Sequence, residues 1–228
     1  MFNGNTVLKN KRQIYGNVWE YQLELDQTLE FVPGQFVSIE VDKMIRRSYS
    51  ILSVEENLLT LVIDLSPGGP GSKFFAQIKP GQNVKIMGPL GRFTLSNVNI
   101  EKVFIATGTG IVPFVPMIKY LLKNQFPHKI SLFFGTKFLE ENKNYHYLNF
   151  EEANYENFEV YRCITRDKFI EDDHTFLGRV TEVLPRLITN WENKEFYICG
   201  VNVMIDDVVD ILNKNNVSPS RIFFEKYG

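Results

Sequence analysis

The chain has 228 residues, of which 44% are hydrophobic and 23% charged, a composition typical of a globular protein with one large or two modest domains. Its formal net charge of -2, without basic residues clustered among aromatic ones, excludes the electrostatic signature of a nucleic-acid-binding protein. Its two cysteines are too few for a four-cysteine iron–sulfur cluster.

Cysteine spacing and hydropathy bear on the compartment. Cys163 and Cys199 lie far apart and belong to no CxxC pair, which favours a reducing, cytoplasmic environment. The longest uncharged stretch, residues 103–118, is shorter than the roughly 20 apolar residues of a membrane span, and residues 1–16 lack the apolar run of a signal peptide. We therefore expect a cytoplasmic protein without a membrane span.

The first half of the chain has the pattern of short strands. Apolar-rich segments such as residues 36–41 and 58–63 are separated by Pro, Gly and Asn. One helix, predicted over residues 72–78, interrupts them after a glycine–proline cluster. This pattern predicts an antiparallel β-barrel.

The second half alternates strands with helices. The predicted helices place apolar residues at four-residue spacing, as at Phe114 and Ile118 or at Met204 and Val208. Alternation of this kind predicts an α/β domain with a parallel sheet covered on both faces. The predicted domains are residues 1–97 and residues 98–228. The predicted strands of the second are residues 103–106, 129–134, 159–165, 196–199 and 221–225.

The four residues Arg47, Ser48, Tyr49 and Ser50 combine a cation, an aromatic ring and two hydroxyls. In an extended segment Arg47 and Tyr49 project to one face, and the two serines project to the other. A guanidinium binds phosphate oxygens and a tyrosine ring offers a flat surface, so the set suits a flavin nucleotide. The alternative is an ordinary half-buried strand with a surface arginine.

Glycines open the lone helix of the first half. Gly69, Gly71 and Ser72 place backbone N–H groups at a helix N-terminus, where an anion such as a phosphate binds. The alternative is a glycine turn in which Ser72 caps the helix.

A second glycine turn, Thr107, Gly108, Thr109 and Gly110, follows a strand and precedes a helix, the position of the phosphate-binding turn in a doubly wound fold. Pro113 stands where the full dinucleotide fingerprint has its third glycine.

Three further strand ends carry candidate residues. Cys199 and Gly200 end a strand at the same predicted edge as the glycine turn, although inert packing is the alternative for the cysteine. Thr165 and Arg166 end another, where the cation suits a 2′-phosphate as well as a plain surface position. Glu225 and Tyr227 end the last predicted strand. His128, His146 and His174 lack metal-ligand spacing, so no metal site is predicted.

The order of these motifs along the chain is more specific than any one of them. Together with Gly88-Pro89-x-Gly91-x-Phe93, they resemble the ferredoxin–NADP reductase superfamily over nearly the whole chain. The resemblance implies an N-terminal antiparallel barrel that binds FAD, rather than FMN, and a C-terminal α/β domain that binds NAD(P).

The resemblance also implies roles for the residues of the barrel. Arg47 binds the flavin pyrophosphate, Tyr49 lies against the isoalloxazine, and Ser50 approaches flavin N5. Gly71 and Ser72 hold the pyrophosphate, with Ser48 and Gly69 beside them in the flavin site.

In the second domain, the resemblance assigns residues 107–110 to the nucleotide pyrophosphate. Cys199, with Gly200, lies beside the nicotinamide, and Glu225 joins Ser50 and Cys199 as the catalytic group. Arg166, with Thr165, matches a position used for the 2′-phosphate, which favours NADPH over NADH. Tyr227 is expected on the flavin, although Gly228 follows it where plant-type members end on the tyrosine.

The resemblance implies hydride transfer from nicotinamide C4 to flavin N5 in a monomeric enzyme that passes electrons to ferredoxin or flavodoxin. One alternative is a reductase component of a multicomponent oxygenase, a type of relative that often carries a fused iron–sulfur domain. Another is a flavin or quinone reductase. A non-catalytic flavin-binding sensor or assembly subunit is the alternative from another class. A flavin-free dehydrogenase is disfavoured because it leaves the β half without a role.

Overall fold

The computed structural model describes residues 2–145, 155–168 and 173–227. The chain divides into two compact units, one formed by residues 1–95 with 112–117 and the other by residues 96–111 with 118–228. The predicted domain boundary between residues 97 and 98 stays a prediction.

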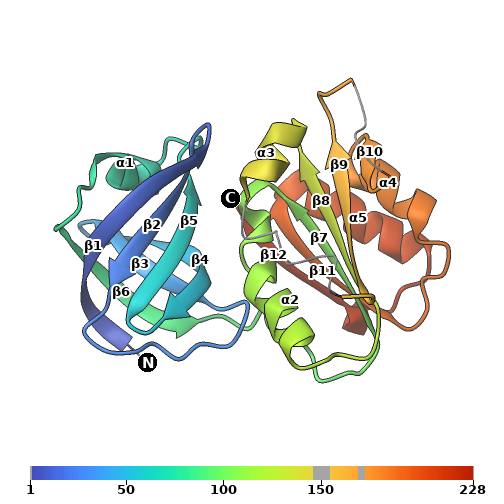
Figure 1. The fold of residues 1–228 in the computed structure, drawn as a ribbon, viewed down its shortest axis with the longest axis horizontal. Helices are drawn as coiled ribbons and strands as arrows, with labels where there is room; N and C mark the ends of the chain where they lie inside the picture. The colour runs from blue at the N-terminus through green and yellow to red at the C-terminus, as the bar shows by residue number, and fades with distance from the viewer. Residues whose placement is uncertain (1, 146–154, 169–172, 228) are drawn as a thin grey trace. The chain divides into compact units, whose positions relative to one another are not determined.

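The first unit is a closed barrel of six antiparallel strands in the order β1-β2-β5-β4-β3-β6, which confirms the predicted barrel (Figure 1). Along β3, Val37, Ile39 and Val41 are buried while the residues between them are partly exposed. This period of two places one face of the strand in the core. The strands are β1 (Phe2–Tyr15), β2 (Val18–Glu24), β3 (Phe36–Asp42), β4 (Ile45–Glu55), β5 (Leu58–Asp64) and β6 (Asn83–Leu90).

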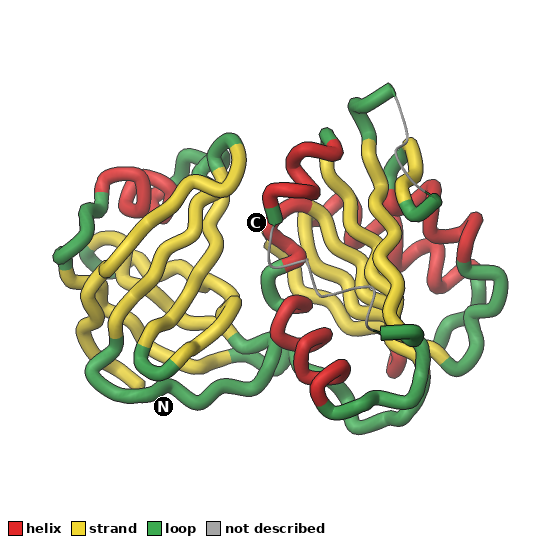
Figure 2. The backbone as a smooth tube through the Cα atoms, in the orientation of Figure 1, coloured by secondary structure: helices red, strands yellow, loops and turns green. Residues whose placement is uncertain are grey.

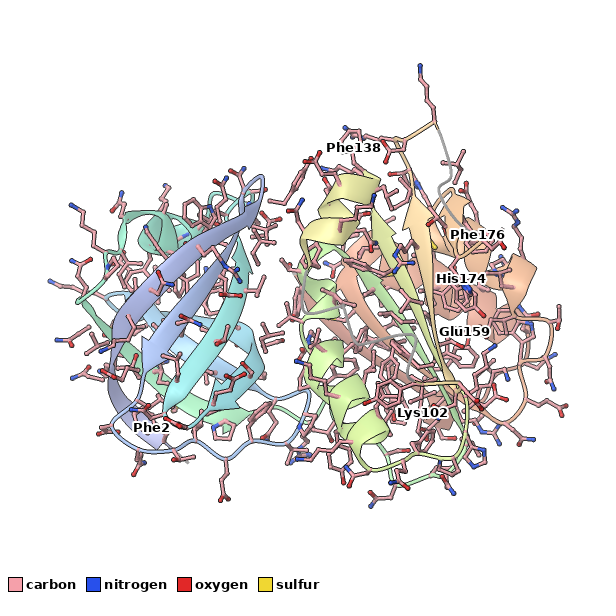
Figure 3. The ribbon with its side chains drawn as sticks, in the orientation of Figure 1. Phe2, Lys102, Phe138, Glu159, His174 and Phe176 are labelled. Atoms are coloured by element: carbon pink, nitrogen blue, oxygen red, sulfur yellow. The ribbon has the colours of Figure 1, made fainter. Side chains whose placement is uncertain are left out.

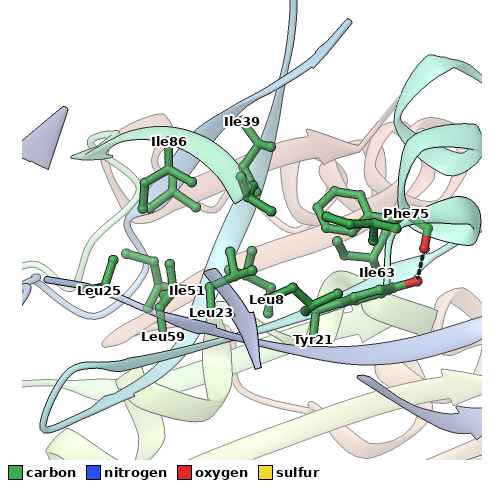
Figure 4. Close-up of a cluster of buried hydrophobic side chains, with 14 of the residues drawn as sticks. Leu8, Tyr21, Leu23, Leu25, Ile39, Ile51, Leu59, Ile63, Phe75 and Ile86 are labelled. Carbon is green, nitrogen blue, oxygen red and sulfur yellow. Dashed lines mark hydrogen bonds between the residues drawn. The ribbon is translucent and has the colours of Figure 1, made fainter. Parts of the chain in front are cut away.

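Helix α1 (Pro70–Gln77) packs against the barrel core (Figure 4). The hydroxyl of Tyr21 donates a hydrogen bond to the carbonyl oxygen of Phe75 at 2.9 Å, and the two rings meet edge to face with centroids 4.7 Å apart. The helix begins two residues before the predicted start, because Pro70 is tolerated in the first turn, where its missing N–H has no intrahelical partner.

The second unit is a six-stranded parallel sheet in the order β10-β9-β8-β7-β11-β12, with helices on both faces (Figures 1 and 2). The sheet confirms the predicted α/β class, and every residue of the central strand β8 is buried, as expected for a strand covered on both sides. The strands are β7 (Glu101–Thr107), β8 (Ile130–Thr136), β9 (Phe158–Ile164), β10 (Thr175–Leu177), β11 (Lys194–Val201) and β12 (Ile222–Tyr227).

Helices α4 and α5 share a buried core with one face of this sheet. Helices α2 and α3 lie over the other face in Figure 1. The helices are α2 (Phe114–Lys123), α3 (Leu139–Asn144), α4 (Val180–Leu187) and α5 (Asn202–Lys214), with a short 3₁₀ turn η4 (Pro219–Arg221) before β12. Among the described residues, no helix is both long and apolar enough to cross a membrane.

The chain after β7 differs from the expectation in one detail. The second glycine turn does not open the α-helix directly but forms a 3₁₀ turn, η1 (Gly108–Ile111), and α2 begins only at Phe114. Pro113 has no N–H to donate and disfavours the helical conformation of Val112, so a continuous α-helix from the glycines is prevented.

Candidate flavin and nucleotide sites

In the barrel, the two larger side chains of the predicted flavin motif lie against helix α1. A Cβ added to Gly71 would stand 2.2 Å from the hydroxyl of Tyr49 and 3.4 Å from Cγ of Arg47, so glycine is required for this approach. The ring of Tyr49 also meets Phe75 edge to face at 5.0 Å. The structure therefore brings Arg47, Tyr49 and Gly71 together, as the sequence suggested.

The serines of the motif occupy different environments. Ser48 is exposed and pairs with Ser38 of β3, whereas Ser50 is buried and pairs with Phe36. Ser50 lies on the same strand face as Ser48, opposite Tyr49, because side chains alternate along a strand.

The N-terminus of α1 faces the same region of the barrel. Gly69 is the N-cap and supplies no side-chain acceptor, so Ser72 stands in the first turn and is not the cap residue considered from the sequence. Backbone N–H groups in a first helical turn have no intrahelical partner and carry partial positive charge. With the exposed guanidinium of Arg47 nearby, this end of the barrel suits a phosphate group.

The phenol of Tyr49 stays protonated over the physiological range. Burial raises the pKa of Tyr49 to about 12, and the charge of Arg47 opposes part of that rise. At neutral pH the tyrosine is therefore a neutral hydrogen-bond donor with a flat ring.

In the α/β unit, three adjacent strands bring the other predicted residues to one edge of the sheet. Ala106 of β7, Cys199 of β11 and Glu225 of β12 are register partners, and η1 follows β7 directly. A Cβ on Gly110 would lie 2.3 Å from the carbonyl oxygen of Cys199, so only glycine lets the turn lie this close to β11.

Gly200 makes a second close approach at this edge. Its φ of +148° lies in a region that favours glycine, and a Cβ there would stand 2.2 Å from Oγ1 of Thr107. The structure thus gathers Thr107, the glycine turn, Cys199, Gly200 and Glu225. We call this group the carboxyl-edge cluster.

Two buried oxygens of the carboxyl-edge cluster, Oγ1 of Thr107 and Oε2 of Glu225, have no hydrogen-bond partner within the described residues. Buried polar atoms in folded proteins are normally hydrogen-bonded, so these unpaired oxygens are available to bind a ligand. The residues present therefore fit a nicotinamide nucleotide, whose amide and hydroxyl groups supply both donors and acceptors.

Burial sets the protonation of the acidic groups here. It raises the pKa of the Glu225 carboxyl and, together with the negative charge of Glu225, raises the pKa of the Cys199 thiol. A thiol with a raised pKa is neutral at physiological pH and a poor nucleophile. The protonation state of Cys199 therefore does not favour covalent attack by its sulfur.

Tyr227 lies at the end of β12, half-buried and paired with Val201. Its side chain hydrogen-bonds the sulfur of Cys199, which works against the rise in the thiol pKa. The role of Tyr227 on the flavin stays a prediction, and Gly228 lies outside the described residues.

Thr165 and Arg166 follow β9 and are exposed, away from the carboxyl-edge cluster. The backbone N–H of Arg166 donates to the carbonyl oxygen of Lys137 at 2.8 Å. Because β8 stands between β9 and β7, and neighbouring strands are about 4.8 Å apart, these residues lie about 10 Å from β7.

Sequence reasoning missed a buried ion pair between Lys102 and Glu195 at the opposite end of the sheet. The only signal was a charged residue near the start of each of two apolar strands. Within the described residues, no three His, Cys, Asp or Glu side chains gather as a metal site would require, and His146 lies outside them.

Two family models match the chain, one to each half. The oxidoreductase FAD-binding domain matches residues 5–95 and the oxidoreductase NAD-binding domain matches residues 104–210. The chain thus contains an FAD-binding domain followed by an NAD(P)-binding domain.

A curated relative is the toluate 1,2-dioxygenase electron transfer component of Pseudomonas putida, 26% identical over 203 residues that cover 88% of this chain and 60% of the relative. This chain therefore spans less than two thirds of that protein.

Among solved structures, a cytochrome P450 reductase from Amycolatopsis has a TM-score of 0.88 at 22% identity, with 99% of this chain and 69% of that chain covered. A ferredoxin NADP+ reductase from Neisseria gonorrhoeae has a TM-score of 0.83 at 21% identity, with 98% of both chains covered. At such identities these structures establish the shared fold. The two family models, in their order along the chain, show that this chain belongs to the ferredoxin–NADP reductase family of FAD-dependent NAD(P)H oxidoreductases.

Proposed function

We propose that this chain transfers electrons between NAD(P)H and a one-electron carrier of the ferredoxin or flavodoxin type, as a ferredoxin–NADP reductase does. The observation that carries the proposal is the pair of unpartnered buried oxygens at Thr107 and Glu225, at the carboxyl ends of β7 and β12 beside the glycine turn and Cys199. A relative named as an electron transfer component supports it.

In the barrel, different residues contact different parts of FAD. Arg47 offers forked donors to the pyrophosphate, and the free N–H groups of Gly71 and Ser72 add donors at the helix N-terminus. Gly69 has open space around it, so a phosphate meets no side chain there. Tyr49 lies against the isoalloxazine, and Ser48 and Ser50 present hydroxyls on the other face of β4. When bound, the FAD accepts a hydride and releases electrons singly.

In the α/β unit, the glycine turn receives the pyrophosphate of the nicotinamide nucleotide, and the hydroxyls of Thr107 and Thr109 add donors to it. Cys199 and Gly200 form the surface beside the nicotinamide. We assign Ser50, Cys199 and Glu225 to the catalytic group, in which burial raises the pKa of the Glu225 carboxyl.

We further propose NADPH rather than NADH as the preferred nucleotide, because the exposed cation Arg166 stands at the carboxyl end of β9, where it can meet a 2′-phosphate. Both cysteines are free thiols, which supports a cytoplasmic location. We expect a monomer, which sedimentation measurements will check.

The test is an absorption spectrum of the purified protein, followed by anaerobic titration with NADPH and with NADH. We expect a flavin spectrum that either nucleotide bleaches, NADPH at the lower concentration. A protein that binds no added flavin, or a bound flavin that neither nucleotide bleaches, contradicts the proposal. The second result identifies the non-catalytic flavin-binding sensor or assembly subunit.

A second candidate is the reductase component of a multicomponent oxygenase, favoured by the similarity to the toluate 1,2-dioxygenase component. The choice of acceptor distinguishes the two. Ferredoxins, flavodoxins, a quinone and free flavin are compared as acceptors for NAD(P)H oxidation. A small iron–sulfur protein of an oxygenase that accelerates the reaction more than the other acceptors supports the second candidate.

A further inference from the structure

A cluster of buried polar groups lies at the amino end of the parallel sheet, opposite the carboxyl-edge cluster. Lys102 and Glu195, each the second residue of its strand, are register partners on β7 and β11. Their side chains are 1% and 2% exposed, and Nζ of Lys102 lies 2.5 Å from Oε2 of Glu195. Figure 3 labels Lys102 at this end of the sheet.

Both charges bind the segment at residues 96–98, which precedes β7. The hydroxyl of Ser96 lies 2.6 and 2.7 Å from the two carboxylate oxygens of Glu195, and Nζ of Lys102 donates to the carbonyl oxygen of Val98 at 2.6 Å. The hydroxyl of Tyr197 accepts from the N–H of Ser96 and donates to Glu195, both at 3.0 Å. We call Ser96, Lys102, Glu195 and Tyr197 the linker clamp.

The position of the linker clamp along the chain is distinctive. Ser96 is the first residue of the α/β unit and follows Leu95, which ends the main segment of the barrel unit. A buried ion pair carries a large desolvation cost, and apolar side chains of similar volume often replace it without loss of stability. Apolar side chains could therefore fill this space equally well. The charged groups are needed for another purpose, namely the hydrogen bonds that fix the segment at residues 96–98.

The linker clamp also shares a sheet face with the carboxyl-edge cluster. Tyr197, two residues after Glu195, stacks between Phe104 at 5.3 Å and Phe223 at 4.8 Å, its register neighbours on β7 and β12. Two residues further along β11 on the same face is Cys199. Four residues of strand span about 13 Å, so the linker clamp acts on Cys199 through the strands and not by contact.

We infer that the linker clamp is a positioning element for hydride transfer, an inference that rests on the proposed function. It gives the chain a rigid point of entry into the α/β unit and holds the strands that carry the carboxyl-edge cluster. With both held, the glycine turn and Cys199 keep one arrangement, and a nicotinamide bound beside them keeps one orientation. Effective transfer depends on such alignment, since a shift of about 1 Å costs up to about a hundredfold in rate.

Three variants of the full chain, loaded with flavin, separate positioning from stability. Ser96→Ala removes the hydroxyl and leaves the ion pair. Lys102→Met with Glu195→Leu replaces the pair by apolar side chains. The matched control is Glu101→Leu with Lys194→Met, which removes the ion pair at the neighbouring register position, on the opposite face of the same two strands.

The first readout is hydrogen exchange, which does not depend on activity. We expect the amides of residues 96–98 to exchange faster in Ser96→Ala and in the Met/Leu double variant, and to be unchanged in the control. The second readout is single-turnover flavin reduction at saturating nucleotide. We expect it to slow about tenfold in both clamp variants, with nucleotide Kd, flavin content and the Tm of the double variant unchanged.

Faster exchange at residues 96–98 with a normal rate of flavin reduction overturns the inference and leaves the proposed function standing. Equal slowing in the control also overturns it, because any ion pair between β7 and β11 then has the same effect, and the linker clamp has no particular role in positioning. A wild-type flavin that neither NADPH nor NADH reduces overturns the proposed function itself, and this inference with it.

Discussion

Buried polar groups at the two ends of the parallel sheet differ in whether they are hydrogen-bonded. At the amino end, Lys102 and Glu195 bind each other and the segment at residues 96–98. At the carboxyl end, Thr107 of β7 and Glu225 of β12 each keep a buried oxygen without a partner in the described part of the chain. A satisfied buried group contributes to the fold, whereas an unsatisfied one is available to a ligand.

The largest effect is expected when one charge of the ion pair at the amino end is removed. Glu195→Leu alone, or Lys102→Met alone, leaves an unpaired buried charge, and we expect each to lower the free energy of unfolding by about 3–5 kcal/mol. Urea denaturation of the single and double variants measures this. Single variants as stable as the wild type contradict the description of the pair as buried and mutually dependent.

The next largest effect is expected at the carboxyl end, where a substitution in the glycine turn changes the backbone of the proposed nucleotide site. Gly110→Ala places a Cβ 2.3 Å from the carbonyl oxygen of Cys199, so the turn must move away from β11. We expect nucleotide Kd to rise at least about tenfold, equivalent to about 1.4 kcal/mol, in a binding titration.

Gly108→Ala is the matched control for that change. No atom lies within 4 Å of its added Cβ, although its φ of +54° carries a modest strain. Equal weakening of binding in both variants shows that backbone strain, and not the approach to Cys199, is responsible.

Local signals made the glycine turns and the flavin motif predictable. Strand alternation placed Arg47 and Tyr49 on one face, and the rule that ligands bind at carboxyl strand ends placed Cys199 beside the glycine turn. Glu225 joined Cys199 only through the resemblance to the family. Lys102 and Glu195 are 93 residues apart, and each resembles an ordinary charge at a strand start. Their pairing depends on which strands become neighbours, which the sequence pattern does not specify.

A smaller effect isolates one unpartnered oxygen. Thr107→Val keeps the shape of the side chain and removes Oγ1, so we expect nucleotide affinity to fall roughly two- to tenfold, the value of one hydrogen bond, without loss of stability.

The control is Thr6→Val in the barrel, where the threonine hydroxyl donates to the carbonyl oxygen of Val84 at 3.0 Å. Here we expect a loss of about 1 kcal/mol in unfolding and no change in nucleotide affinity. The reverse pattern, with Thr107→Val destabilising and nucleotide binding intact, indicates that Oγ1 of Thr107 serves the fold.

The smallest expected effect concerns Glu225 and pH. Burial raises the pKa of its carboxyl in the folded protein, so folding favours the protonated form. The resulting stabilisation is complete below the unfolded-state pKa, near 4.5, and is lost as the pH rises through the folded-state value. Glu225→Gln, which carries no charge, is expected to flatten this part of the stability profile and to leave the protein slightly more stable at pH 7. Measuring the free energy of unfolding of both proteins from pH 4 to pH 8 gives the slope of stability against pH. If Glu225→Gln leaves that slope unchanged, Glu225 is hydrogen-bonded within the protein and resembles the satisfied groups at the amino end.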